Sequence, residues 1–179
     1  MVYVHFAEGF EEIEAVTIVD VLRRAGVETK AVSVTGDLTV CGSHGIPVCT
    51  DILFEDVNYD DCEMIVLPGG MPGTTNLLAH EGLTSQIVSF AKNKKHVAAI
   101  CAAPMVFGKL GILEGKKATI YPGMEENLIG AKVQSDRVVI DGHVITSKGP
   151  GTAMEFSLAL VGVLKSEEEA ARLKKAMVV

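Results

Sequence analysis

Tryptophan is absent from this sequence of 179 residues, and aromatic residues make up only 5% of it. No apolar run approaches the roughly 18 residues that a membrane-spanning helix needs. Hydrophobic residues still make up 48% of the chain, so the core must consist mostly of aliphatic side chains. This composition excludes a disordered chain and a collagen-like repeat. We expect one domain that covers residues 1–179.

Basic residues are scarce relative to acidic ones, with 16 Lys and Arg against 23 Asp and Glu and a net charge of −7. An acidic surface repels phosphate backbones, which argues against a nucleic-acid partner. No basic segment followed by an apolar stretch marks a secretory signal near Met1. We therefore expect a cytoplasmic protein without a membrane partner, whose four cysteines are reduced thiols. These are Cys41, Cys49, Cys62 and Cys101.

Short β-branched runs alternate with longer helical patterns along the chain, which favours an α/β fold. We expect strands at 2–6, 27–34, 64–67, 96–100, 119–121, 137–140 and 144–147, and a hairpin over 38–49. Helices are expected at 11–25, 75–79, 83–92, 102–110, 152–165 and 167–175. The continuous apolar strands predict a mostly parallel, doubly wound sheet between helical layers. Chemistry in such sheets gathers beyond the carboxyl ends of the strands.

Cys101 lies where the apolar run 97–100 ends and a helix begins. A turn from strand to helix exposes such a side chain, and the helix N-terminus favours a thiolate. Ala102 and Ala103 permit a tight turn, and Pro104 suits the first helical turn. The alternative is a buried cysteine that packs as a small hydrophobic residue.

Glu14 lies at the start of the first expected helix, whose later positions are mostly apolar. A carboxyl group that loses solvent there has a raised pKa, and once protonated it can donate a hydrogen bond to a thiolate. The alternative is a solvated acid in the first helical turn. Glu11 and Glu12 are interpreted as first-turn acids that the helix dipole favours. A third strand end carries Gly69 and Gly70, whose amides could form an oxyanion hole or only a tight turn.

Four motifs in this order resemble the ThiJ/PfpI superfamily, in the branch of the parkinsonism-associated protein deglycase and its bacterial relatives. They are the segments 6–14, 66–70, 98–104 and 146–152. The resemblance extends from about residue 2 to about residue 165. It implies a flavodoxin-like α/β sandwich, usually a homodimer.

The resemblance also implies roles for individual residues. Cys101 would be the reactive cysteine, and Glu14 the protonated acid that hydrogen-bonds its sulfur. Backbone N–H groups of Gly69, Gly70 and Ala102 would surround the site. Neither a metal nor an organic cofactor is expected. Further candidates for the pocket are Tyr121, His44 and Pro150.

The sequence departs from the family pattern at three positions. Tyr121 stands where the deglycase carries a His with a proposed proton-transfer role, and a tyrosine hydroxyl is a poorer proton shuttle near neutral pH. His44 stands where the deglycase has an Arg, and is interpreted as a pocket residue or an exposed turn residue. Ala102 replaces the His that follows the cysteine in the peptidase branch, which argues against a peptidase.

Two functions of different classes follow from this site. The first is a cysteine-dependent enzyme that acts on reactive carbonyls such as methylglyoxal or on glycated adducts, of the glyoxalase or deglycase type. The second is a redox-sensing or chaperone-like stress protein in which Cys101 is oxidised to a sulfinate without turnover.

The remaining thiols and imidazoles are expected to be unreactive. Cys41 and Cys49 are expected to pack in the hairpin strands or to lie at a dimer contact. Cys62 lies in an acidic stretch, so we expect a raised pKa. No His and Cys pair has a zinc-binding spacing.

Overall fold

A computed structural model describes all residues, 1–179, as an α/β sandwich around a seven-stranded sheet. Its strands are β1 (Val2–Phe6), β2 (Thr29–Ser33), β5 (Ile52–Leu53), β6 (Met64–Leu67), β7 (His96–Ile100), β10 (Val138–Asp141) and β11 (Val144–Ser147). They lie in the order β10-β11-β7-β6-β1-β2-β5, and only β10 pairs antiparallel. Because the other strands are parallel, the loops after β1, β6, β7 and β11 meet at one edge of the sheet.

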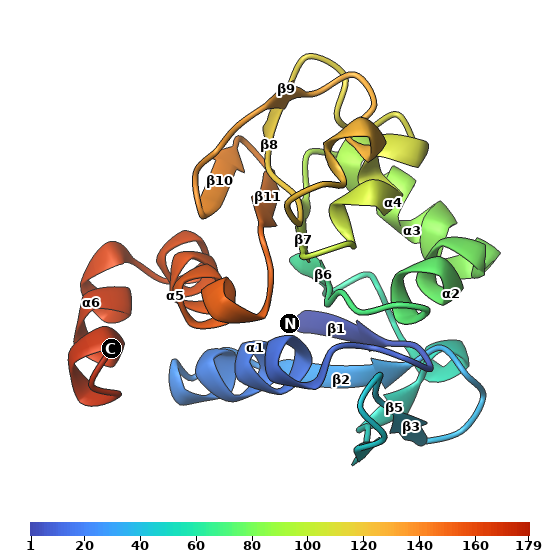
Figure 1. Ribbon diagram of the computed structural model, residues 1–179. Coiled ribbons are helices and arrows are strands. Elements are labelled where there is room, and N and C mark those ends of the chain that lie inside the picture. The colour runs from blue at the N-terminus through green and yellow to red at the C-terminus, as the bar shows by residue number, and fades with distance from the viewer.

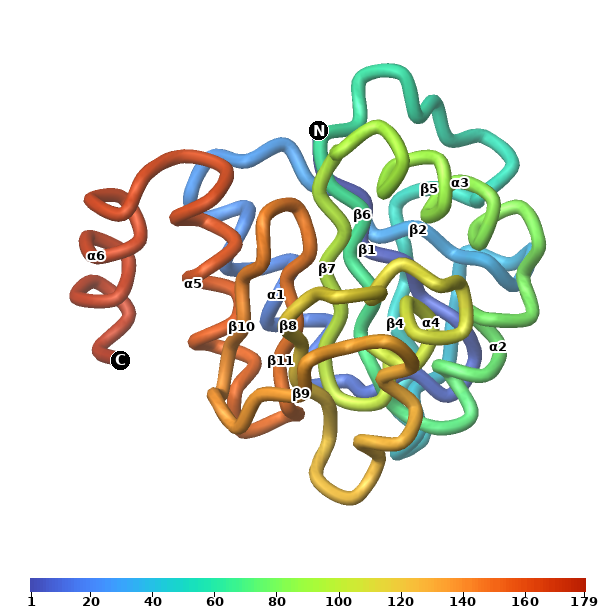
Figure 2. The backbone as a smooth tube through the Cα atoms, turned by 90° about the horizontal axis from the view of Figure 1, so that it is seen from above, coloured from blue at the N-terminus to red at the C-terminus, as the bar shows by residue number.

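Helices cover both faces of this sheet (Figure 1). One layer consists of α1 (Glu12–Arg24), α5 (Ala153–Leu164) and α6 (Glu167–Ala176). The other consists of α2 (Gly73–Ala79), α3 (Glu81–Lys92) and α4 (Pro104–Lys109). Seen from above, α5 and α6 lie at the β10 end of the sheet and α2 lies at the opposite end (Figure 2). No helix combines the length and the apolar character needed to cross a bilayer.

The apolar core divides into two clusters, one on each side of the sheet. In β1, Val2, Val4 and Phe6 face the layer of α1 and α5, whereas Tyr3 packs in the cluster of α3 and α4. Side chains of a strand alternate between faces, so a continuous apolar run is what a strand buried on both faces requires. The core is mostly aliphatic and alanine-rich, in agreement with the scarcity of aromatic residues.

The expected elements are confirmed except around one strand. The expected strand at 119–121 is wrong: β8 is Lys117–Ala118, and it pairs with β9 (Lys132–Val133) outside the main sheet. The segment after β8 leaves the ladder because the Tyr121 amide donates to the Cys101 carbonyl oxygen at 2.9 Å. The expected hairpin exists as β3 (Thr39–Cys41) and β4 (Pro47–Cys49). Three short 3₁₀ turns, at Phe54–Asp56, Glu125–Asn127 and Pro150–Thr152, were not expected.

Candidate active site

Cys101 occupies a strained turn directly after β7. Its φ is +63°, a left-handed conformation that side chains other than glycine rarely adopt. The turn is held from two sides, because the Cys101 amide donates to the Ser147 carbonyl at 3.0 Å and its own carbonyl accepts from Tyr121. α4 begins three residues later at Pro104. The expected turn from strand to helix is therefore present, and these two backbone hydrogen bonds stabilise its left-handed conformation.

Glu14 lies in the first turn of α1 and is fully buried. Its Oε2 atom accepts the Gly69 N–H at 2.7 Å, while Oε1 is buried without a hydrogen-bonded nitrogen or oxygen. The first turn is fixed by Glu11, whose carboxylate accepts the Glu14 amide at 2.8 Å and whose own amide donates to the Gly69 carbonyl at 2.9 Å. A solvated acid at position 14 is thereby excluded, and Glu11 acts as the helix N-cap.

Gly69 brings the acid and the thiol together. A Cβ atom at this position would lie 2.5 Å from the Cys101 Cβ and 2.8 Å from the Glu14 Oε2. Only a residue without a side chain allows this approach. The Gly69 amide donates to the Glu14 Oε2, so in this structure it acts on the acid rather than on the sulfur. The N–H groups that act on the Cys101 sulfur belong to Gly70 and Ala102.

The buried pair holds a proton at neutral pH. Burial raises the pKa of Glu14 from 4.5 to about 7, against the opposing hydrogen bond from Gly69. Burial, followed by the Glu14 carboxylate, raises the pKa of the Cys101 thiol to about 12, although the Gly70 and Ala102 amides lower it. The expected low thiol pKa is therefore wrong while Glu14 is ionised, because desolvation outweighs the backbone dipoles. Glu14 and Cys101 titrate as a coupled pair, and a proton on Glu14 removes the charge that opposes a thiolate.

A pocket of about 690 Å³ opens in front of the thiol. It is lined by Cys101 and Gly70, and by the three expected pocket residues Tyr121, His44 and Pro150. Cys101 is 9% exposed and lines this pocket, which gives a small molecule access to the sulfur. A second hollow of about 560 Å³ between α5 and α6 contains no cysteine or histidine and lies away from this chemistry.

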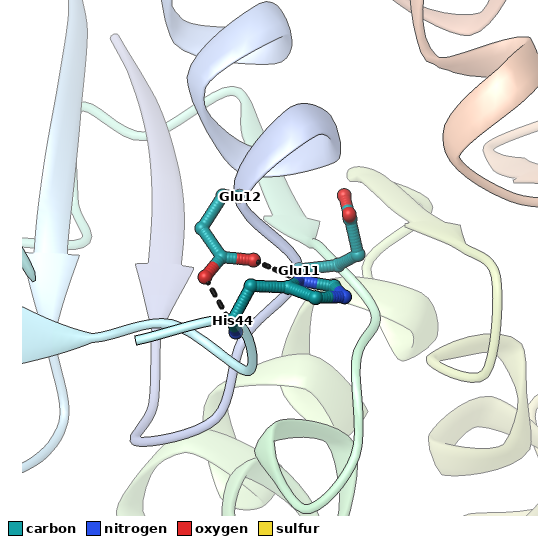
Figure 3. A group of neighbouring side chains, drawn as sticks. All are labelled: Glu11, Glu12 and His44. Carbon is teal, nitrogen blue, oxygen red and sulfur yellow. Dashed lines mark hydrogen bonds and ion pairs between the residues drawn. The ribbon is translucent and has the colours of Figure 1, made fainter. Parts of the chain in front are cut away.

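Glu12 and His44 form an ion pair that the sequence did not reveal (Figure 3). The Glu12 carboxylate accepts the His44 amide at 2.7 Å and lies 2.7 Å from the His44 Nδ1. Although burial alone would raise it, these hydrogen bonds lower the pKa of Glu12 to about 2. The His44 pKa is raised by the same hydrogen bond and charge. Its side chain is 69% exposed, as expected for a turn residue, and its Nδ1 atom contacts the buried Glu12 carboxylate.

Glu11, Glu12 and His44 are the three side chains whose donor atoms could surround a cation, all within 4.8 Å of one another. Their donors are already in use, since Glu12 binds His44 and Glu11 binds the Glu14 amide. No local sequence signal marks this contact. It depends on Gly42, where a Cβ atom would lie 2.3 Å from the Glu12 carboxylate.

The other cysteines are free thiols. Cys62 is buried and its pKa is raised to about 11, as expected, but burial rather than the acidic neighbours is the largest cause. Cys49 is exposed and Cys41 half-buried, so the expectation that both pack inside the hairpin is wrong. Val40 and Val48 of the hairpin face the core, so their chain neighbours Cys41 and Cys49 lie on the opposite face of the hairpin.

The fold and the site together define a class: flavodoxin-like α/β proteins with a cysteine at a strained turn beside a buried carboxyl group. A family model described as the DJ-1/PfpI family matches residues 1–162. This chain belongs to the DJ-1/PfpI family.

Individual relatives agree with this assignment. Protein DJ-1 homolog A of Arabidopsis thaliana is 41% identical over 99% of this chain, although the chain spans only 46% of that protein. A deglycase of Pyrococcus abyssi is 32% identical, with 89% of this chain and 96% of the relative aligned. The solved structure described as Toxoplasma gondii DJ-1, oxidized, superposes with a TM-score of 0.95 at 36% identity, covering 99% of this chain and 97% of that one.

Proposed function

We propose that this protein is a cysteine-dependent, stress-protective enzyme that acts on small reactive carbonyls or their adducts. The observation that carries the proposal is the Cys101 thiol, held in a left-handed turn beside the fully buried Glu14 and facing a pocket of about 690 Å³. The similar Pyrococcus protein named a deglycase supports carbonyl chemistry of this type. Four free thiols agree with the cytoplasmic setting that we propose.

The first chemical step is addition of the Cys101 sulfur to an aldehyde carbon. Transfer of the shared proton to Glu14 generates the thiolate, and Glu14 then returns a proton to the new alkoxide oxygen. The amides of Gly70 and Ala102, which act on the sulfur, also face the negative charge that develops beside it. The product of this step is a hemithioacetal, formed without loss of any atom.

With methylglyoxal, conversion of the hemithioacetal to a thioester oxidises the first carbon and reduces the second within the same molecule. Water then hydrolyses the thioester to lactate and restores the thiol. Deglycation would use the same attack on a carbonyl adduct. No added reductant, oxidant or organic cofactor is required for these steps.

We also propose a homodimer in which a second copy covers one apolar face. Ile13 and Val16 of α1 are 59% and 47% exposed, and Ile46 in the neighbouring hairpin is 54% exposed. Single exposed apolar residues are ordinary, but a group of three beside a pocket favours a protein contact. Ile13 and Ile46 also line the pocket, so the partner would narrow its mouth.

Lactate formation from methylglyoxal tests the enzymatic proposal. We expect wild-type protein to form lactate above the buffer rate, and Cys101→Ser to lose this activity. Cys49→Ser is the matched control, because that thiol is exposed and outside the pocket, and it should retain full activity. Lactate formation by Cys101→Ser at the wild-type rate would refute the proposal.

A redox-sensing role is the second candidate, favoured by the groups around the sulfur. A sulfinate at Cys101 could accept hydrogen bonds from protonated Glu14 and from the Gly70 and Ala102 amides. Intact mass after graded peroxide should then show a stepwise gain of two oxygens at Cys101. Equal oxidation of Cys41 and Cys49 would count against this role.

A further inference from the structure

The Glu12 and His44 pair has the geometry of a carboxylate-oriented imidazole. Glu12 is 7% exposed, and its carboxylate contacts two groups of His44, the backbone amide and the ring Nδ1. Because the carboxylate accepts from Nδ1, the neutral ring carries its proton there and leaves Nε2 as an acceptor. The Nε2 end of the ring points away from Glu12 (Figure 3).

His44 and the Cys101 thiol line the same pocket, although they belong to distant parts of the chain. The hairpin that carries His44 is fastened to the loop after β1, since the Ser43 amide donates to the Phe10 carbonyl at 2.8 Å. The same loop is fastened to the glycine turn beside Cys101 through the bond from the Glu11 amide to Gly69. The backbone that carries His44 is therefore held near the glycine turn beside Cys101, and the Glu12 carboxylate holds the Nδ1 side of the imidazole.

Conversion of a hemithioacetal requires a base that removes the proton from its carbon. Glu14 lies beside Cys101 and is used for the oxygen protons. The Glu11 carboxylate accepts the Glu14 amide, and Tyr121 offers only a hydroxyl group. We propose that His44 is the catalytic base that moves the carbon-bound proton, with Glu12 as its positioning residue. This assignment rests on the proposed addition of Cys101 to the carbonyl.

The step balances within the adduct. Glu14, ionised after the addition step, takes the proton of the hydroxyl on the sulfur-bearing carbon and passes it to the ketone oxygen. His44 Nε2 removes the proton bonded to the same carbon, and the electron pair forms the carbon–carbon double bond of an enediolate. The His44 imidazolium delivers its proton to the other carbon, which leaves a hydroxyacyl thioester and the two side chains in their starting states.

The charged and titratable groups that face His44 are Glu11 and Glu12 of α1, with Cys101 and Tyr121 across the pocket. The two carboxylates stabilise the imidazolium, so the pKa of His44 lies above its ordinary 6.5. Only the neutral ring accepts a proton. The turnover number should therefore rise with pH through this raised pKa.

Two substitutions at one position separate a base from a simple positive charge. His44→Gln should lower kcat about 10²-fold with little change in KM. His44→Arg keeps the charge and can pair with Glu12, yet cannot act as a base, so it should be equally impaired. His143→Gln is the control, since His143 lies in the turn between β10 and β11 outside the pocket, and it should retain wild-type kcat.

Glu12→Gln tests the positioning role. Loss of its charge should move the acidic limb of the kcat profile to lower pH and reduce kcat, and Glu12→Asp should restore part of both. An acidic limb that stays in place in Glu12→Gln would overturn the positioning role.

Adduct formation separates this proposal from the proposed function. If wild-type protein forms lactate and His44→Gln still adds methylglyoxal to Cys101 but converts it slowly, the assignment holds. Wild-type turnover in both His44 variants overturns the role of His44 alone. Absence of lactate with wild-type protein overturns both proposals.

Discussion

Replacement of Glu14 by glutamine should make the free energy of unfolding less dependent on pH. Glu14 has a folded-state pKa of about 7 against an ordinary 4.5, because it is fully buried. An acid whose pKa is raised by folding stabilises the fold fully below the unfolded value, and this contribution is lost as pH rises through the folded value. Between pH 4 and pH 8 the loss amounts to about 3 kcal/mol in the wild-type protein. Glutamine keeps the acceptor for the Gly69 amide and does not ionise.

Urea unfolding followed by far-UV circular dichroism measures this effect, since the chain has no tryptophan to report by fluorescence. The unfolding free energy of Glu14→Gln minus that of the wild type should increase by about 3 kcal/mol from pH 4 to pH 8. With a slope near 2 kcal/mol per molar urea, the difference between the two midpoints should widen by about 1.5 M.

Glu81→Gln, at an exposed position in the first turn of α3, provides the matched control. Its difference from the wild type should not grow over the same pH range. If the difference in unfolding free energy between Glu14→Gln and the wild type stays constant or shrinks as pH rises, Glu14 is not the buried, neutral carboxyl group on which the site depends.

Three further predictions address packing, thiol reactivity and turnover. Gly69→Ala should destabilise the fold by about 2–4 kcal/mol in thermal or urea unfolding, because the added Cβ meets the Cys101 Cβ, whereas Gly151→Ala, with open space at its Cβ, should change stability by less than about 0.5 kcal/mol. The Gly69 argument fails if both substitutions cost the same. Cys62, buried with a pKa of about 11, should resist iodoacetamide at pH 8 in native protein and react after unfolding, as read by peptide mass. Rapid native labelling of Cys62 would contradict its burial. In the turnover assay, His44→Arg should be as impaired as His44→Gln, and full activity of the Arg variant would show that charge alone suffices.

Much of the fold could be predicted because strand and helix periods are local properties of the sequence. The run Val2–Phe6 and the run His96–Ile100 are apolar at every or nearly every position, and strands buried on both faces need this pattern. The strand expected at 119–121 does not form because the Tyr121 amide donates to the carbonyl oxygen of Cys101, a residue distant in the sequence. The short β5 and β9 pairings, of two residues each, are too brief to leave a periodic signal.

The candidate site, too, could be predicted only where it depends on local sequence. The turn at Cys101 and the glycine pair at 69–70 follow from their positions at strand ends, and both lie where the sequence indicated. The burial of Glu14 and the hydrogen bond from the Gly69 amide to its carboxylate depend on how three loops pack together. No single segment of the sequence specifies that packing. For the same reason Glu12 and His44, 32 positions apart, gave no sign of their contact.

The most direct test of the central claim is to identify the residue of the protein to which the substrate becomes covalently bound. Wild-type protein should be mixed with methylglyoxal, sampled over time, and mapped by peptide mass spectrometry alongside the measurement of lactate. We predict one methylglyoxal mass on Cys101, which decays as lactate appears, and no such adduct on Cys101→Ser. Stable adducts on the exposed Cys49, with Cys101 unmodified while lactate accumulates, would contradict the account.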